Sequence, residues 1–187
     1  MNILLNDDNG APIDIYSKLA EDRVIFVGDL TDQEASDIVA TLLQKSFEDP
    51  TEKITLLINS TGGDIRNAFM IYDTMNMIGC PIETICLGDA WQEAVLLLAA
   101  GNKGARYASK SATICPSQLE QRRYMHTDIA GVRDIMGRVQ RDNKNFIAAL
   151  AKATCKKTSV LMKELDRQQY LSASQAKAFG IVDQVIG

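Results

Sequence analysis

The sequence is poor in the side chains that hydrolytic chemistry near neutral pH uses most. It contains one histidine among 187 residues. Histidine is the side chain whose unperturbed pKa lies between pH 5 and 8. His126 is therefore the only imidazole that can serve as a general base, and any histidine-dependent site must include it.

Long apolar runs are also missing, and none approaches the roughly 20 residues of a membrane-spanning helix. Residues 1–11 carry Asp7 and Asp8, with no basic stretch ahead of an apolar core, so they do not have the form of a signal or transit peptide. The net charge of -4 argues against a nucleic-acid or anionic-membrane surface. We expect a cytoplasmic protein, or one in the equivalent organelle stroma or matrix after processing.

Cysteine is sparse and is not spaced as in known zinc sites. Three of the four cysteines lie within or beside apolar runs, which favours buried free thiols in a reducing compartment. We expect no metal or other cofactor. The four are Cys80, Cys86, Cys115 and Cys155.

The remaining composition is typical of one globular domain, with 46% hydrophobic and 24% charged residues. Short β-branched runs alternate with segments of helical periodicity, which predicts an α/β fold with a largely parallel sheet. Expected strands cover 23–28, 53–58, 81–87, 105–108, 112–115 and 182–186. Expected helices cover 31–49, a segment after Gly62 and Gly63 with Ile65, Ala68, Phe69 and Tyr72 on its inner face, 90–100, 128–153, and 172–180.

Two of these helices begin with the pattern of a capping box, at Thr31 and at Ser172. The helix over 128–153 is long and rich in charge, so it is unlikely to bury one face within a single small domain. We expect it to project from the domain and pack against another subunit.

Several segments, in order, resemble the proteolytic subunit of Clp protease. The resemblance implies one domain over 1–187 with the ClpP/crotonase-like fold of repeated ββα units, a handle at about 116–153, and an axial N-terminal segment that is altered here over 1–11. It also implies seven-membered rings stacked in pairs around a proteolytic chamber, with an AAA+ unfoldase as partner. The segments are DIYS at 14–17, DRVIF at 22–26, INSTGG at 58–63, IYDTM at 71–75, TICLG at 84–88, LLAAG at 97–101, KGAR at 103–106, YLSA at 170–173 and FGIVD at 179–183.

The catalytic positions of that family carry other residues in this chain. Residues 88–94 read GDAWQEA, so Gln92 stands where the resemblance places the nucleophilic serine, and an amide cannot form an acyl-enzyme. Ser117 falls at the position of the histidine base, and Gln168 at that of the acid. We therefore expect a catalytically inactive, ClpR-like paralogue with a structural or regulatory role.

The oxyanion loop is retained only in part. The resemblance gives one donor to the amide of Gly63 and the other to the residue after the nucleophile, here Glu93. A carboxylate there places negative charge where negative charge must develop. We prefer to interpret Gly62 and Gly63 as a turn that needs positive φ. Residues 119–125, LEQRRYM, lack the glycines of the family's substrate-binding strand, and they fit a crowded cleft and a solvated charge run equally well.

Two binding surfaces follow from the resemblance. Asp166 and Arg167 match a ring-to-ring contact network, although they also fit an ordinary surface ion pair. The pocket that receives unfoldase loops is expected to include Thr55, Leu57, Met77, Ile85, Leu87, Tyr107 and Ser109.

Three functions stay open. We expect a non-catalytic subunit of a heptameric or double-ring core, formed with a catalytic Clp proteolytic subunit. The alternatives are a serine-type endopeptidase of this family with a relocated active site and a binding module whose altered cleft holds a peptide or adaptor. A relocated site would use Ser117 with a lysine or Cys115 with His126. The apolar strand around Cys115 argues against the thiol, because burial raises a thiol's pKa.

Overall fold

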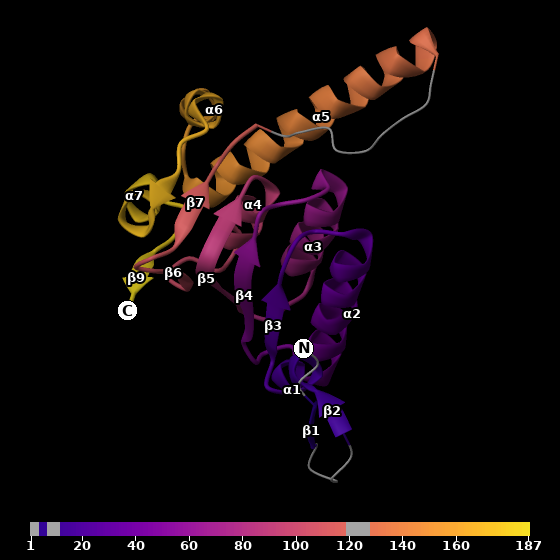
Figure 1. The fold of residues 1–187 in the computed structure, drawn as a ribbon, viewed down its shortest axis with the longest axis vertical. Coiled ribbons are helices and arrows are strands. Elements are labelled where there is room, and N and C mark those ends of the chain that lie inside the picture. Colours follow the sequence, from indigo (N-terminus) through magenta and orange to yellow (C-terminus); the bar gives the residue numbers. More distant parts are fainter. Residues whose placement is uncertain (1–3, 7–11, 119–127) are drawn as a thin grey trace.

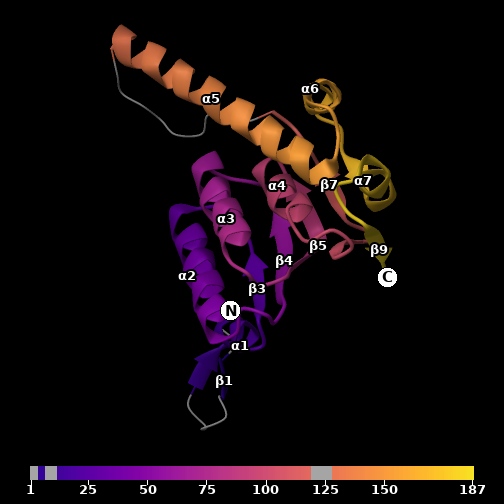
Figure 2. The same ribbon diagram turned by 180° about the vertical axis from the view of Figure 1, so that it is seen from behind.

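The computed structural model describes residues 4–6, 12–118 and 128–187. Figure 1 shows a twisted sheet with α2, α3, α4 and α5 behind it, and Figure 2 shows the same helices in front of the sheet from the other side. In chain order the elements are β1 (Leu4–Asn6), β2 (Pro12–Asp14), α1 (Ile15–Glu21), β3 (Val24–Val27), α2 (Asp32–Glu48), β4 (Ile54–Ser60), α3 (Ile65–Met77), β5 (Ile82–Trp91), α4 (Glu93–Ala99), β6 (Arg106–Ser109), β7 (Thr113–Cys115), α5 (Ile129–Thr154), α6 (Thr158–Arg167), β8 (Leu171–Ser172), α7 (Ala173–Phe179) and β9 (Gln184–Ile186).

The main sheet is largely parallel, which confirms the α/β class. Its strands run in the order β3-β4-β5-β6-β9, and all these neighbours are parallel. Strand β7 pairs in parallel with the end of β5 and antiparallel with β8. Parallel neighbours require crossover connections, which the intervening helices supply.

The core lies between the sheet and its helices. Every residue of α4 is buried, because this helix packs against β5, α3 and α5. On α3 the buried face carries Ala68, Ile71 and Met75. Of the inner-face residues expected from sequence, Ala68 is buried, whereas Ile65, Phe69 and Tyr72 are only partly buried.

Helix α4, which the sequence predicts over 90–100, starts later than expected. Residues Ala90 and Trp91 continue β5, because they pair with Ile114 and Cys115 of β7. The helix therefore begins at Glu93, and the expected start at residue 90 is wrong. Helices α1 and α6 were not expected at all.

The two capping boxes have different outcomes. At Ser172 both hydrogen bonds of the box are present, with Gln175 as the partner. At Thr31 only the hydroxyl contributes, by accepting the Glu34 N–H. The Glu34 carboxylate instead accepts the N–H of Gly28, so the expected box is only half formed.

Helix α5 projects from the domain, as the sequence predicts (Figures 1 and 2). Among its described side chains, the first buried one is Phe146, and Leu150 and Thr154 follow at helical spacing. These residues fix the C-terminal part of the helix to the core, whereas none of the side chains described in its N-terminal half is buried. No helix in the described part of the chain is long and apolar enough to cross a membrane.

Candidate functional site

The turn between β5 and α4 places Gln92 in a backbone conformation that few residues other than glycine adopt. Its φ is 49° and its ψ is -117°, and its N–H donates to the Cys115 carbonyl at 2.9 Å. Such conformations cost about 1–3 kcal/mol. In α/β hydrolases a sharp strand-to-helix turn of this kind presents the nucleophile. In this chain the turn presents the side-chain amide of Gln92 instead.

The loop before α3 faces this turn, and its two glycines meet different requirements. Gly62 has a φ of 96°, which confirms the expected turn. Gly63 is needed for space instead, since a Cβ there would lie 2.5 Å from the carbonyl oxygen of Leu30. The Leu30 N–H in turn donates to the Gly62 carbonyl at 2.9 Å, which fixes the loop.

The Glu93 carboxylate lies directly against this loop. Its Oε2 accepts the N–H of Gly63 at 3.1 Å, and the side chain is fully buried. A Cβ placed on Gly62 would lie 2.6 Å from the same oxygen. The amide that the resemblance assigns to the oxyanion is thus bound by a carboxylate of the chain itself.

The other two triad positions lie in different environments. Ser117 follows β7 and is only 4% exposed. Its Oγ has no hydrogen-bond partner among the described residues. Gln168 caps the end of α6 in the left-handed conformation, with a φ of 47°, and it is exposed.

Contacts between flanking residues bring these three segments together. The Trp91 ring, next to Gln92, meets the Tyr170 ring edge to face at 5.4 Å between centroids. The side-chain amide of Gln118, which follows Ser117, donates to Asp166. The fold therefore gathers the positions of a triad, although positions 92, 117 and 168 supply neither imidazole nor carboxylate.

The alternative nucleophiles are poorly placed. Cys115 is 7% exposed, and burial raises the pKa of its thiol, which lowers the fraction of reactive thiolate. His126 lies outside the described residues, as does the segment 119–125. Within the described ranges, no three His, Cys, Asp or Glu side chains are grouped so that they could hold a metal ion.

Comparison with known proteins identifies the family. The pattern of the Clp protease family matches residues 7–187. The chain belongs to the Clp protease family. It is 37% identical over 175 residues to the ATP-dependent Clp protease proteolytic subunit 1 of Cutibacterium acnes, which covers 93% of this chain and 81% of that protein. It is 37% identical over 172 residues to the ATP-dependent Clp protease proteolytic subunit 2 of Mycobacterium bovis, which covers 91% and 80% respectively.

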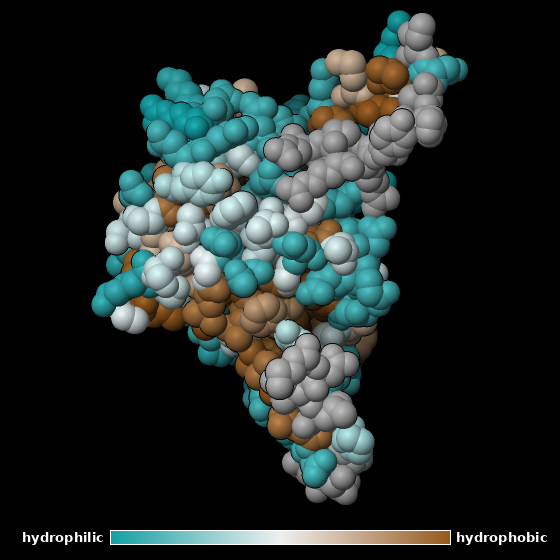
Figure 3. Space-filling view, in the orientation of Figure 1, coloured by the Kyte–Doolittle hydropathy of each residue, from teal (hydrophilic) through white to brown (hydrophobic). Residues whose placement is uncertain are grey.

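The residues expected in a Clp unfoldase pocket, except Met77, lie on the sheet face opposite the helices. Inward and outward side chains alternate along β4, β5 and β6, and these residues occupy the outward positions: Thr55, Leu57, Ile85, Leu87, Tyr107 and Ser109. Leu57 pairs with Ile85, and Ile85 with Tyr107, so an apolar row crosses three strands. Figure 3 shows apolar surface gathered over the strands on this face. Met77 is 69% exposed at the end of α3.

The two ring-contact candidates are both exposed near the end of α6. Asp166 accepts from Gln118, and a guanidinium nitrogen of Arg167 lies 3.4 Å from a carboxylate oxygen of Glu164. They do not pair with each other in the described structure. Trp91 is the residue near the site that the sequence did not single out, although an aromatic side chain next to position 92 was a visible signal.

Proposed function

We propose that this chain is a non-catalytic subunit of a Clp-type ATP-dependent protease core, which contributes to ring assembly and to the regulation of protein degradation. One observation carries the proposal. The strained turn between β5 and α4, which resembles the turn that presents the nucleophile in α/β hydrolases, presents Gln92 here. The adjacent Glu93 carboxylate binds the Gly63 N–H.

The chemistry of acyl transfer supports the proposal that the subunit is non-catalytic. The reaction needs an activated nucleophile, a base and donors for the oxyanion. An amide at position 92 supplies no nucleophile, and the hydroxyl of Ser117 has a pKa far above 7, so it cannot act as a base. Loss of the whole triad in an active serine peptidase costs roughly 10⁶-fold in turnover. We expect the isolated protein to hydrolyse peptides at background rates.

A role in assembly is supported by the surfaces that the fold leaves uncovered. The helix-free sheet face carries the apolar row of Leu57, Ile85 and Tyr107. The N-terminal half of α5 extends away from the domain. We propose that α5 joins the chain to a catalytic Clp proteolytic subunit in a heptameric or double-ring particle, and that the apolar row receives an AAA+ unfoldase. The polar side chains of Thr55 and Ser109 on the same sheet face would weaken or alter docking of an AAA+ unfoldase.

The catalytic part of the proposal is tested with a fluorophosphonate probe and small fluorogenic peptides. We expect neither labelling nor hydrolysis by the isolated protein. Hydrolysis that is abolished by Ser117→Ala or by Cys115→Ala would instead establish a relocated active site. Both variants should be checked for unchanged thermal unfolding before they are compared.

The assembly part is tested by native mass spectrometry after co-expression with a catalytic Clp subunit from the same cell. We expect stable mixed particles, and single or unstable double rings for the chain alone. A monomer at high concentration that binds no Clp subunit would refute it.

A further inference from the structure

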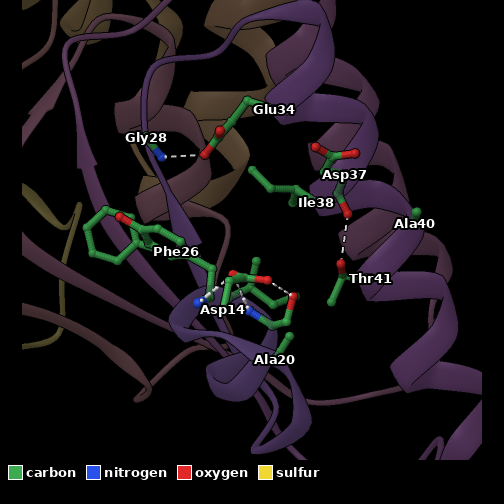
Figure 4. Close-up of a pocket in the computed structure, with 12 residues that line it drawn as sticks. Asp14, Ala20, Phe26, Gly28, Glu34, Asp37, Ile38, Ala40 and Thr41 are labelled. Carbon is green, nitrogen blue, oxygen red and sulfur yellow. Dashed lines mark hydrogen bonds between the residues drawn. The ribbon is translucent and has the colours of Figure 1, made fainter. Parts of the chain in front are cut away.

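A cavity of about 700 Å³ lies away from the catalytic positions, between α1, β3 and α2. In Figure 4, the Phe26 side chain lies on the side of β3 turned away from α2, and Glu34 reaches from α2 to Gly28. The lining also includes Asp14 at the start of α1, and Asp37 and Ile38 on α2. A volume of this size is in the range of sites that bind ligands or side chains.

The lining carries acidic groups and no basic ones. Asp14 accepts the N–H groups of Tyr16 and Ser17, each at 3.0 Å. Asp37 accepts a side-chain N–H of Gln33 at 2.9 Å, and Glu34 accepts the Gly28 N–H at 3.1 Å. All of these donors are neutral, and none of the three carboxylates forms an ion pair within the described part of the chain.

The charge at this place persists over the physiological pH range. The hydrogen bond from the Ser17 hydroxyl, together with backbone donors, lowers the pKa of Asp14 below its ordinary value. Asp37 is exposed on α2, where water solvates its carboxylate. A cation that entered the cavity would therefore meet fixed negative charge.

One wall of the cavity is an open strand edge. Strand β3 ends the sheet and pairs only with β4 among the described strands. The Arg23 carbonyl accepts the Thr55 N–H of β4, so the backbone groups of Val24 and Phe26 face the opposite, outer side. The Gly28 N–H, which faces the same side, is bound by Glu34. An unpaired edge of this kind is where an extended segment adds to a sheet by main-chain hydrogen bonds.

An aromatic pair borders the cavity on the face of β3 turned away from α2, where Phe26 pairs with the outward-facing Leu57. The rings of Tyr16 and Phe26 meet edge to face, with centroids 5.9 Å apart. Tyr16 is 62% exposed, so part of this pair remains accessible from outside. Because the side chains of an added strand alternate between the two faces, this pair would contact the side chain next to the one that enters the cavity.

We propose that this cavity binds a lysine or arginine side chain of an extended segment of a partner protein, which pairs through its backbone with the outer edge of β3. The carboxylates select the cationic head, the aromatic pair packs against the neighbouring side chain of the segment, and the strand edge selects a polypeptide over a small amine. Because neither the cavity nor the strand edge involves Gln92 or Glu93, the proposal does not depend on whether the subunit is catalytic.

The test uses a fluorescein-labelled octapeptide of alternating valine and arginine, with a matched peptide in which glutamate replaces arginine. Binding to the full chain is measured by fluorescence anisotropy at several salt concentrations. We expect saturable binding of the basic peptide only, weakened as salt rises. The double variant E34Q/D37N should lose at least tenfold in affinity, because glutamine still accepts the Gly28 N–H while the charge is gone. The matched control is Asp73→Asn, which removes an exposed charge on α3 and should leave the affinity unchanged.

Hydrogen exchange locates the binding site. The basic peptide should protect the Phe26 amide from exchange in the wild type, and much less so in the double variant. Equal binding of both peptides, equal losses in the Asp73 variant and the double variant, or protection confined to another region would each overturn the proposal. So would a change in self-association in E34Q/D37N with unchanged peptide affinity, since the cavity would then be a contact between copies of the chain.

Discussion

Replacing the three catalytic positions is expected to restore little activity as long as Glu93 remains. The triple variant Q92S/S117H/Q168D supplies a nucleophile, a base and an acid. In the wild type, however, the Gly63 N–H is bound by the Glu93 carboxylate at 3.1 Å, so an oxyanion would lose this donor and meet a negative charge. Removing one oxyanion donor in a well-studied serine peptidase costs about 10²–10³-fold in kcat, or about 2.7–4 kcal/mol.

Two substitutions at position 93 distinguish the effect of occupying the Gly63 N–H from the effect of the negative charge of Glu93. Glu93→Met leaves the Gly63 N–H open and fits a buried position of similar size. Glu93→Gln removes the charge, although its amide oxygen can still accept that N–H. In the triple background we expect peptide hydrolysis to rise at least about 100-fold with Glu93→Met. Glu93→Gln should give a smaller rise.

The assay is steady-state hydrolysis of a fluorogenic peptide, with fluorophosphonate labelling to count reactive serines. Asp73→Asn in the triple background is the control and should change nothing, since this carboxylate is exposed on another helix. Glu93→Met alone should remain inactive, because Gln92 has no hydroxyl. Full activity of the triple variant with Glu93 in place would refute the reasoning. Equal activity of the Met and Gln variants would show that occupancy of the amide is unimportant.

Three further predictions concern stability, measured by urea unfolding. Arg106→Met should lower the free energy of unfolding by about 3–5 kcal/mol, because the guanidinium is 2% exposed and its loss leaves Asp183 without its partner at 2.5 Å. The hydrogen bond from Arg106 lowers the pKa of Asp183 below its ordinary value. The stabilisation by this pair is therefore fully present above the ordinary pKa of an aspartate and is lost as pH falls through the lowered, folded-state pKa. Wild-type stability should thus fall more steeply below about pH 4 than that of Asp183→Asn, and parallel curves would contradict this. Gln92→Gly should raise stability by about 1 kcal/mol through relief of the positive φ, whereas Gln44→Gly within α2 should lower it by about 1 kcal/mol.

The sequence predicts the sheet strands better than the element boundaries around the site. A mostly apolar segment such as 90–100 is compatible with strand or helix, and only the pairing of Ala90 and Trp91 with β7 extends β5 to the turn. The capping box at Thr31 is only half formed for a similar reason. The Glu34 carboxylate accepts the Gly28 N–H, and the Thr31 N–H donates to the Asp29 carbonyl instead, a competition that the local sequence pattern does not reveal.

The sequence alone determined the family and the residues at the triad positions, because ordered motifs fix which residue stands at each place. It also determined that Gly62 occupies a turn, since a positive φ is a local property of the backbone. Tertiary structure alone decided that Glu93 binds the Gly63 amide, a contact across 30 residues. That contact exists because β4 and β5 lie side by side and end at the same edge of the sheet, which places the loop after one against the helix after the other. The cavity between α1, β3 and α2 has the same origin, since its carboxylates and rings come from three elements whose spacing in the sequence says nothing of their distance in space.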